Sequence, residues 1–239
     1  MNTRKKQLDD LRKMVAKMVA TNTHKKDSDG YFQPFVDGKT GNGSAILRFL
    51  EALPGEEWPF VLLWNHSFKI DGTWYINNCP STLNLPCPVC EANTVLWKSG
   101  KSEVVSARKR KLYYHSNVLV VRDPKQPEND GKVMLYKYGV KIFGKIKDAI
   151  TPPFPDTLPM DPFDSYEGAN FRLRITEKNG FRDYDKSSFD DPSEIGTEEY
   201  IASVLDKRQS LDEIVAPHQF KPYEELKAQF DKVIGGKAA

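Results

Sequence analysis

Short runs of β-branched and aromatic residues recur between positions 31 and 181, and they predict a structure built mainly of β-strands. Turn residues such as Asp71-Gly72, Asn129-Asp-Gly131 and Asn179-Gly180 separate these runs. The predicted strands span residues 44–50, 60–64, 73–76, 113–121, 133–138 and 169–176. Several short strands of this kind favour a small β-barrel or sandwich.

Helical periodicity occurs near both ends of the chain and twice inside the β-rich part. From Gln7 to Ala20 the apolar residues are spaced three and four apart, opposite a basic face, which is typical of an amphipathic helix. The polar segment Thr21–Gly30 predicts a linker. Further helices are predicted over residues 91–98, 141–150, 197–205 and 223–234. Five prolines within residues 151–163 predict a rigid, irregular connector.

These patterns divide the 239 residues into three parts. Residues 1–30 form a basic arm, residues 31–190 form a β-rich core, and residues 191–239 form a helical extension. The length permits one large domain with extensions or two small ones. The fold class predicted from the pattern is therefore α+β, mainly β with accessory helices.

The net charge of +2 conceals an uneven distribution along the chain. Residues 1–26 carry eight Lys and Arg against two acids, and residues 101–147 carry twelve against four. Residues 183–239 carry seven Lys and Arg against thirteen acids. A polyanionic partner for the two basic segments is one interpretation, and an ordinary solvated surface is the other.

The sequence lacks a run of about 18 apolar residues, so we expect no membrane span. The N-terminus is charged and has no hydrophobic stretch of the kind that signal peptides carry. We therefore expect a cytoplasmic protein in a reducing compartment, where thiols bind metals and do not form disulfides.

His66, Cys79, Cys87 and Cys90 follow the spacing H-x12-C-x7-C-x2-C and use all three cysteines of the chain. One histidine and three thiolates are a ligand set for tetrahedral Zn²⁺. The alternative is three scattered thiols and a surface histidine, which the absence of any other cysteine disfavours. We predict one structural zinc ion in a subdomain over about residues 62–100, with no open position for catalysis.

An enzymatic zinc site is a second interpretation of the same cysteines. Pro86-Cys87-Pro-Val-Cys90 matches half of the zinc deaminase signature, whose other half is H-x-E. Here Ser67 and Phe68 follow His66, so the proton-shuttling glutamate is missing. Cys79 would also fill the position that a catalytic zinc leaves open for water. With no P-loop, G-x-S-x-G or dinucleotide motif, we expect no enzymatic activity.

Basic and aromatic residues alternate in three places, which favours a binding site for single-stranded nucleic acid. Arg108-Lys-Arg-Lys111 is followed by Tyr113-Tyr-His115, and Tyr136-Lys-Tyr138 and Phe181-Arg-Asp-Tyr184 come later. Cations contact phosphates, and rings stack on unpaired bases. The alternative for each ring is the hydrophobic core. Because Tyr136 and Tyr138 share one face of a strand, both lie in the core or both lie in the cleft.

The chain resembles the gene 32 protein family, the single-stranded DNA-binding proteins of T-even-like bacteriophages. The resemblance covers about residues 40–185 and lies in several motifs that occur in the same order. They are Ala45-Ile-Leu-Arg-Phe-Leu50, Asn65-His-Ser-Phe68, Trp74-Tyr-Ile76, Cys87-Pro-Val-Cys90, Lys109-Arg-Lys111, Val118-Leu-Val-Val121, Pro127-Glu-Asn129, Gly131-Lys-Val133, Glu167-Gly-Ala-Asn-Phe171 and Gly180-Phe181. The family implies an OB-fold core with an inserted zinc subdomain, and cooperative, sequence-nonspecific DNA binding in replication, recombination and repair.

The resemblance also implies roles for individual residues. Metal ligands fall on His66, Cys79, Cys87 and Cys90. DNA contacts fall on Arg48, Tyr75, Lys109, Arg110, Lys111, Tyr114, Tyr136, Phe181 and Tyr184, to which we add Tyr138 and His115 from their place in the basic-aromatic runs. Arg4, Lys5 and Lys6 resemble the family's motif for contact between neighbouring protomers on DNA. Phage replication and recombination proteins are further expected partners.

The sequence departs from the family pattern at several positions. His115 replaces a cleft tryptophan, and Val104 and Val105 stand where a tyrosine is expected. The loop between Cys79 and Cys87 is shorter and lacks its aromatic residue. Fewer rings should leave phosphate contacts a larger share of the affinity. An acidic C-terminal tail is absent, so either the chain is truncated after Ala239 or this relative lacks the tail.

Two rival functions remain open from the sequence alone. The acidic C-terminal part is compatible with a zinc-containing protein-interaction adaptor. RNA binding is the closer rival, because a ring stacks on the bases of either nucleic acid.

Overall fold

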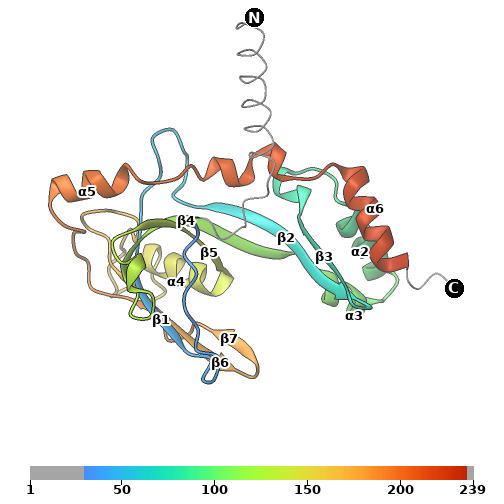
Figure 1. The fold of residues 1–239 in the computed structure, drawn as a ribbon, viewed down its shortest axis with the longest axis horizontal. Helices are drawn as coiled ribbons and strands as arrows, with labels where there is room; N and C mark the ends of the chain where they lie inside the picture. Colours follow the sequence, from blue (N-terminus) through green and yellow to red (C-terminus); the bar gives the residue numbers. More distant parts are fainter. Residues whose placement is uncertain (1–29, 236–239) are drawn as a thin grey trace, which may run out of the picture.

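The computed structural model describes residues 30–235 and shows a mixed α/β fold around a curled antiparallel sheet (Figure 1). The predicted helix over residues 7–20 lies outside the described residues. Strands follow the order β3-β2-β4-β1-β6-β7, with β5 paired to β4 and β8 paired to β6. Five α-helices, α2 to α6, accompany the sheet within residues 30–235.

The long strand β4 (Lys111–Arg122) connects two lobes of the molecule (Figure 1). Its first half pairs with β2 (Val61–Ile70), and its second half pairs with β1 (Gly43–Phe49). β5 (Val133–Gly139) runs along most of β4 on its other edge. The first lobe forms around β1, β5 and the end of β4, and we call it the barrel lobe. The second lobe forms around β2 and the cysteines, and we call it the Cys/His lobe.

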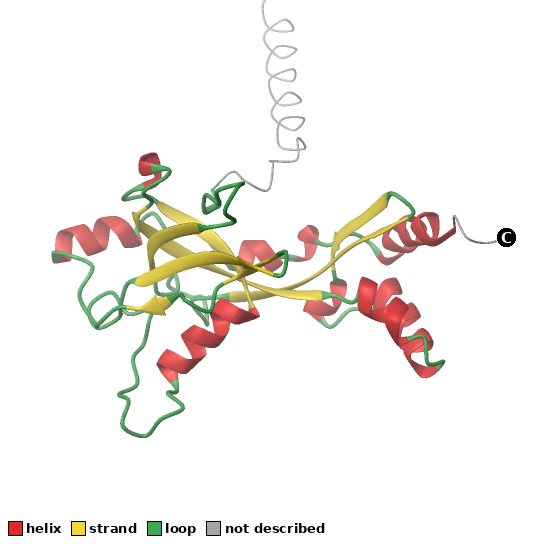
Figure 2. Cartoon of the chain, turned by 90° about the horizontal axis from the view of Figure 1, so that it is seen from below, coloured by secondary structure: helices red, strands yellow, loops and turns green. Residues whose placement is uncertain are grey.

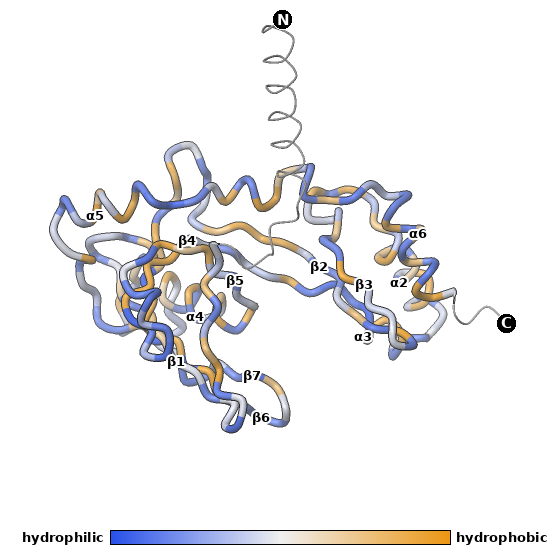
Figure 3. The backbone as a smooth tube through the Cα atoms, viewed as in Figure 1, coloured by the Kyte–Doolittle hydropathy of each residue, from blue (hydrophilic) through white to orange (hydrophobic). Residues whose placement is uncertain are grey.

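Alternating side chains build the core of the barrel lobe. In β6 (Phe171–Lys178), which pairs with β1, Phe171, Leu173 and Ile175 are buried and the residues between them are not. Figure 3 shows hydrophobic and hydrophilic residues mixed around β1 and β6 in this lobe. The helix α4 (Val140–Ile150) contributes Ile142 and Ile146 to the same core. Burying each large apolar side chain stabilises the fold by about 1.5–3 kcal/mol.

A second core holds the Cys/His lobe together. β2 and β3 (Thr73–Asn78) form a hairpin whose turn uses Asp71 and Gly72, both with positive φ. Helices α2 (Pro88–Lys98), α3 (Ser102–Arg108) and α6 (Tyr223–Ile234) surround this hairpin at one end of the molecule (Figure 2). The ring of Phe68 stacks on Tyr75 at 5.0 Å, and Phe230 of α6 packs edge-on against both. The C-terminal helix is thus part of this core.

The remaining segments are short. β7 (Phe181–Asp183) forms a hairpin with β6, and β8 (Ser188–Phe189) pairs with the start of β6. The helix α5 (Glu198–Leu205) begins at Thr197, whose hydroxyl accepts a hydrogen bond from the amide of Tyr200. Within residues 30–235, no helix has the length and apolar character needed to span a membrane.

All six predicted strands overlap β1 to β6, and the predicted helices over 91–98, 141–150, 197–205 and 223–234 overlap α2, α4, α5 and α6. Residues 151–163 contain no helix or strand, as predicted. The helix α3 and the strands β7 and β8 were not predicted. These three elements are seven, three and two residues long, too short to show a period in the sequence.

Candidate metal centre and nucleic-acid interface

The side chains of His66, Cys79, Cys87 and Cys90 converge on one point in the Cys/His lobe. One ligand atom from each residue lies within 4.8 Å of all the others. The Nε2 atom of His66 lies 3.6 Å from Cys87 Sγ and 3.4 Å from Cys90 Sγ, and Cys79 Sγ lies 3.6 Å from Cys90 Sγ. The structure therefore brings the predicted ligand set together.

The spacing of these atoms fits a tetrahedral zinc ion. With Zn–S bonds of about 2.3 Å and Zn–N bonds of about 2.0–2.1 Å, a tetrahedron has edges of about 3.5–3.8 Å. Three of the six separations, at 3.4 to 3.6 Å, match those edges, and all six are within 4.8 Å. The donor set of one imidazole and three thiols also suits this ion, so the residues present fit the group that the spacing predicts.

Local structure positions each ligand. His66 lies on β2, Cys79 immediately precedes a 3₁₀ turn, and Cys87 is the N-cap of α2, which places Cys90 in its first turn. The Nδ1 atom of His66 lies 3.2 Å from the carbonyl oxygen of Arg108. A proton on Nδ1 that is donated to this carbonyl leaves Nε2 free to coordinate a metal.

Contacts within the cluster shift the pKa values of His66, Cys79 and Cys90. Burial lowers the pKa of His66, but interactions with the sulfur atoms of Cys79 and Cys87 outweigh burial and raise it to about 9. Hydrogen bonds from Cys87 and Cys90 lower the pKa of Cys79, whereas the hydrogen bond to Cys79 raises the pKa of Cys90. A cation bound at this point would replace these protons, because thiolates and a neutral imidazole are its ligands.

The cysteine cluster is connected to the basic run through one serine. The hydroxyl of Ser81 lies 3.0 Å from Cys79 Sγ and accepts a hydrogen bond from Nη1 of Arg110. The guanidinium of Arg110 also lies over the ring of Trp64, 4.2 Å from its centroid. Arg110 is therefore held in place, while Lys109 and Lys111 on either side are exposed.

Six residues that the sequence predicts as DNA contacts have buried side chains. They are Arg48, Tyr75, Tyr114, His115, Tyr136 and Tyr138. The ring of Tyr114 stacks on Phe143 of α4 at 3.8 Å, and Tyr136 and Tyr138 stack on each other at 5.5 Å inside the barrel lobe. Tyr136 and Tyr138 therefore both lie in the hydrophobic core, which is one of the two positions that the sequence left open for this pair. Their burial does not support direct stacking on a base, and their role as DNA contacts stays a prediction.

Burial also determines the charge of the His115 side chain. Its Nδ1 atom lies 2.9 Å from the hydroxyl of Tyr31. Burial, together with the nearby charge of Lys137, lowers the pKa of His115 to about 3. The imidazole is therefore neutral at neutral pH and offers no charge to a phosphate.

The side chain of Arg48 links separate segments of the backbone inside the fold. Its side chain is fully buried, and Nη2 donates hydrogen bonds of 2.8 Å to the carbonyl oxygens of Asp164 and Ser193. These contacts join β1 to the irregular segment before β6 and to the segment after β8. These contacts give Arg48 a structural role, and its contact with a phosphate stays a prediction.

Replacing Arg48 with methionine should lower stability without weakening DNA binding. The change removes the two hydrogen bonds from Arg48 to the carbonyl oxygens of Asp164 and Ser193, which costs about 1–3 kcal/mol. We expect the free energy of unfolding in urea to fall by about that amount while the Kd for a short oligo-dT stays the same. The exposed Lys132 (Lys132→Met) is the stability control. A weaker Kd with unchanged stability would restore Arg48 to the interface.

Sequence reasoning missed one exposed pair. The ammonium of Lys137 lies 4.3 Å from the ring centroid of Tyr113, on the face of β4 and β5 that points away from Tyr114 and Tyr138. His115 is the residue directly opposite Lys137, so Tyr113 is its diagonal neighbour. The sequence could have indicated this position, because Lys137 stands between Tyr136 and Tyr138 in a strand and so points to the opposite face from these two core tyrosines.

The ring of Phe181, at the start of β7, is the most exposed of the predicted stacking residues. It is 78 % exposed, whereas Tyr184 is half-buried and packs against the barrel core. Trp58, Trp74 and Trp97 are each more than half exposed and were not predicted as contacts. Phe181 combines sequence prediction with a ring free to stack.

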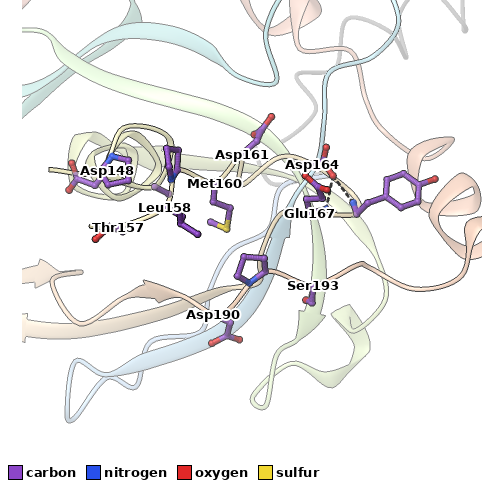
Figure 4. Close-up of a pocket in the computed structure, with 14 residues that line it drawn as sticks. Asp148, Thr157, Leu158, Met160, Asp161, Asp164, Glu167, Asp190 and Ser193 are labelled. Atoms are coloured by element: carbon purple, nitrogen blue, oxygen red, sulfur yellow. Dashed lines mark hydrogen bonds between the residues drawn. The ribbon is translucent and has the colours of Figure 1, made fainter. Parts of the chain in front are cut away.

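A groove of about 730 Å³ lies between the end of α4, the proline-rich segment and residues 190–193 (Figure 4). Its lining includes five carboxylates, from Asp148, Asp161, Asp164, Glu167 and Asp190, and neither lysine nor arginine. Figure 4 shows acidic side chains at both ends of the groove. Negative charge of this density repels a phosphate backbone, so this groove is not the nucleic-acid interface.

Comparison with known proteins gives consistent matches over most of the chain. Residues 41–234 match the family model described as gp32 DNA binding protein like. The chain is 36% identical over 241 residues to the single-stranded DNA-binding protein of Enterobacteria phage T4, covering 97% of this chain and 79% of that protein. It is 39% identical over 207 residues to the protein of the same name from Enterobacteria phage T2, covering 83% and 68%.

Proposed function

Because the chain belongs to the family of gp32-like DNA-binding proteins, we propose that it is a cooperative, sequence-nonspecific single-stranded DNA-binding protein of phage replication, recombination and repair. Proteins of this family bind DNA and are not enzymes. The relatives from phages T4 and T2 are named single-stranded DNA-binding proteins, which supports the same activity here. The host-cell cytoplasm is the proposed site of action.

The observation that carries this proposal is the pairing of cations with half-buried rings at the surface. Arg110 lies over Trp64, and Lys137 lies over Tyr113. Lys109 and Lys111 are exposed beside the first pair. Cations that contact phosphates, next to flat rings that stack on bases, bind single strands with little regard to sequence.

Titration of tryptophan fluorescence tests the proposal. Trp64 lies under Arg110, so DNA that binds the basic run should change its emission. We expect saturable binding to oligo-dT, weaker binding to duplex DNA, and an affinity that falls with salt. Tighter binding to RNA than to oligo-dT would favour the RNA-binding alternative, and no binding to any nucleic acid would favour an adaptor.

We further propose that the barrel lobe is an OB-fold core and that about residues 62–100 form its inserted zinc subdomain. The tetrahedral fit of His66 and the three cysteines supports a single structural Zn²⁺ ion. All four positions would be filled by protein, so the ion would hold the subdomain folded and perform no chemistry. Through Ser81 it would also fix Arg110.

Replacing Phe181 with alanine should weaken DNA binding and leave the fold intact. Stacking on one base contributes about 1–3 kcal/mol, so Kd should rise about 5- to 150-fold. The ring is 78 % exposed, so thermal stability should not change. Phe154→Ala, at a ring that is 67 % exposed near the acidic groove, is the matched control. Equal Kd values for the two variants would remove Phe181 from the interface.

Cooperativity is proposed to come from the N-terminal arm with Arg4, Lys5 and Lys6, which lies outside the described residues. Neighbouring protomers on the same DNA strand would be its partners. Deleting residues 1–20 should abolish cooperative binding to long DNA and preserve affinity for a short oligonucleotide. Cooperative isotherms that persist after the deletion would assign the contact between protomers to another segment.

A further inference from the structure

A second groove, of about 760 Å³, runs along the outer face of the barrel lobe where β1 and β6 lie side by side (Figure 1). Its lining comes from β1, β6, the end of β4 and the segment before β1. Four basic residues line it, Arg122, Lys125, Arg172 and Arg174, against the single acidic residue Asp37. We call it the β6 groove.

Strand register brings the arginines together. Ile46 of β1 is paired with Arg122 of β4 on one side and with Arg172 of β6 on the other. Arg174 is paired with Ser44, the next residue along the same face of β1. Phe171, Leu173 and Ile175 point into the core, so Arg172 and Arg174 share the outer face. The pairing of β4, β1 and β6 therefore places the three arginines side by side on one face of the sheet.

Two of the arginines have no counter-charge. Arg172 forms an ion pair with Asp190 at 2.5 Å. The carboxylate of Asp37 accepts hydrogen bonds from the amides of Lys39 and Thr40, which lower its pKa and keep it ionised. Within residues 30–235, the side chains of Arg122 and Arg174 form no ion pair and no hydrogen bond, and both are exposed. Like charges placed close together on a sheet destabilise it, and a polyanion would offset this effect.

The groove also offers a ring and continues toward the predicted stacking residue. Phe35, which is 42 % exposed, lines the groove beside the arginines. Lys178, at the end of β6, is paired with Phe181. Arg174 and Lys178 are four residues apart on the same face, or about 13 Å at about 3.3 Å per residue. A strand that stacks on Phe181 therefore needs only a few nucleotides to reach Arg174.

We infer that the β6 groove binds a second segment of the single-stranded DNA through its phosphates, with Arg122 and Arg174 as the contacts and Phe35 as a stacking ring. This inference rests on the proposed function. DNA would then cross the molecule from the basic run at the start of β4, past Phe181, to the outer face of β1 and β6. The groove lengthens the occupied site beyond what the basic run covers.

The test compares the double variant Arg122→Gln, Arg174→Gln with the control Lys227→Gln, Lys232→Gln on α6, which removes the same charge. Each protein is titrated with a short oligo-dT of about 6 nucleotides and a long one of about 20 nucleotides, within and beyond the span of one OB-fold site. Two lost phosphate contacts should reduce the salt slope on the long oligonucleotide by about 1.4, which is about a 25-fold loss of affinity near 0.1 M salt. Affinity for the short oligonucleotide should not change.

The outcomes separate this inference from the proposed function. If the unchanged protein binds neither oligonucleotide, the proposed function fails. If the double variant and the control have equal salt slopes on the long oligonucleotide, the groove does not bind DNA and the inference fails alone. An equal loss on both oligonucleotides would make the groove the primary site, which also overturns the inference. Both arginines are exposed, so circular dichroism should confirm unchanged folding of the variant.

Discussion

Replacing Cys87 with serine should remove the bound metal and lower the melting temperature of the protein by at least about 10 °C. Structural zinc contributes about 10 kcal/mol or more to small zinc modules, and each kcal/mol shifts the Tm of a domain of this size by about 2–4 °C. Cys87 is both one of the four candidate ligands and the N-cap of α2 in the Cys/His lobe. Differential scanning calorimetry with zinc analysis of the same sample measures both effects.

The control for this experiment is Ser81→Ala. It removes the hydroxyl that lies 3.0 Å from Cys79 Sγ but no ligand atom, so the protein should keep one zinc ion per chain. Because Ser81 also accepts the hydrogen bond from Arg110, DNA affinity should fall modestly in this control. A Cys87→Ser protein with full zinc content and unchanged Tm would refute the structural metal centre.

Substituting Lys109, Arg110 and Lys111 together with alanine should weaken binding to oligo-dT about 100-fold near 0.1 M salt. Each phosphate contact on a single strand contributes about 0.7 to the slope of log K against log salt, so three lost contacts flatten the slope by about 2. The three side chains lie at the start of β4, with Arg110 fixed against Trp64 and its neighbours exposed. Titrations at several salt concentrations measure the slope directly.

A triple substitution with the same loss of charge serves as the comparison. Lys221, Lys227 and Lys232 lie on or next to α6, and the first two form ion pairs with acids four residues away. Their replacement by alanine lowers the net charge equally without touching the basic run. If both triple variants lose the same affinity and slope, net charge alone accounts for the effect and the phosphates bind elsewhere.

The convergence of His66 with the three cysteines could be predicted from the sequence because their spacing and their chemistry are both visible there. Cys87 and Cys90 are three residues apart, at the N-cap and in the first turn of one helix, and Cys79 is the only other cysteine in the sequence. Strands and helices of more than about seven residues were likewise visible as periods. In each case the information needed lies within a few dozen residues of the chain.

The interface was harder to predict because it depends on which face of a strand meets the core. A period of two places Tyr136 and Tyr138 on the same face, but it does not say which face is covered. That choice is made by α4, whose Phe143 stacks on Tyr114. Likewise, the acceptors of Arg48 are backbone carbonyls more than one hundred residues away, and carbonyl positions leave no trace in a sequence. Contacts between residues far apart in the sequence therefore determine both the buried face of the tyrosine strand and the hydrogen-bond partners of Arg48.

The sharing of β4 between the two lobes has a mechanical consequence. One continuous strand of twelve residues pairs with β2 in its first half and with β1 in its second half. A hinge motion between the lobes would have to break ladder hydrogen bonds within that strand. Residues 30–235 should therefore keep their shape when the protein binds its ligand, which limits the loss of conformational entropy. If the shape stays constant, each bound molecule should cover the same length of the DNA strand.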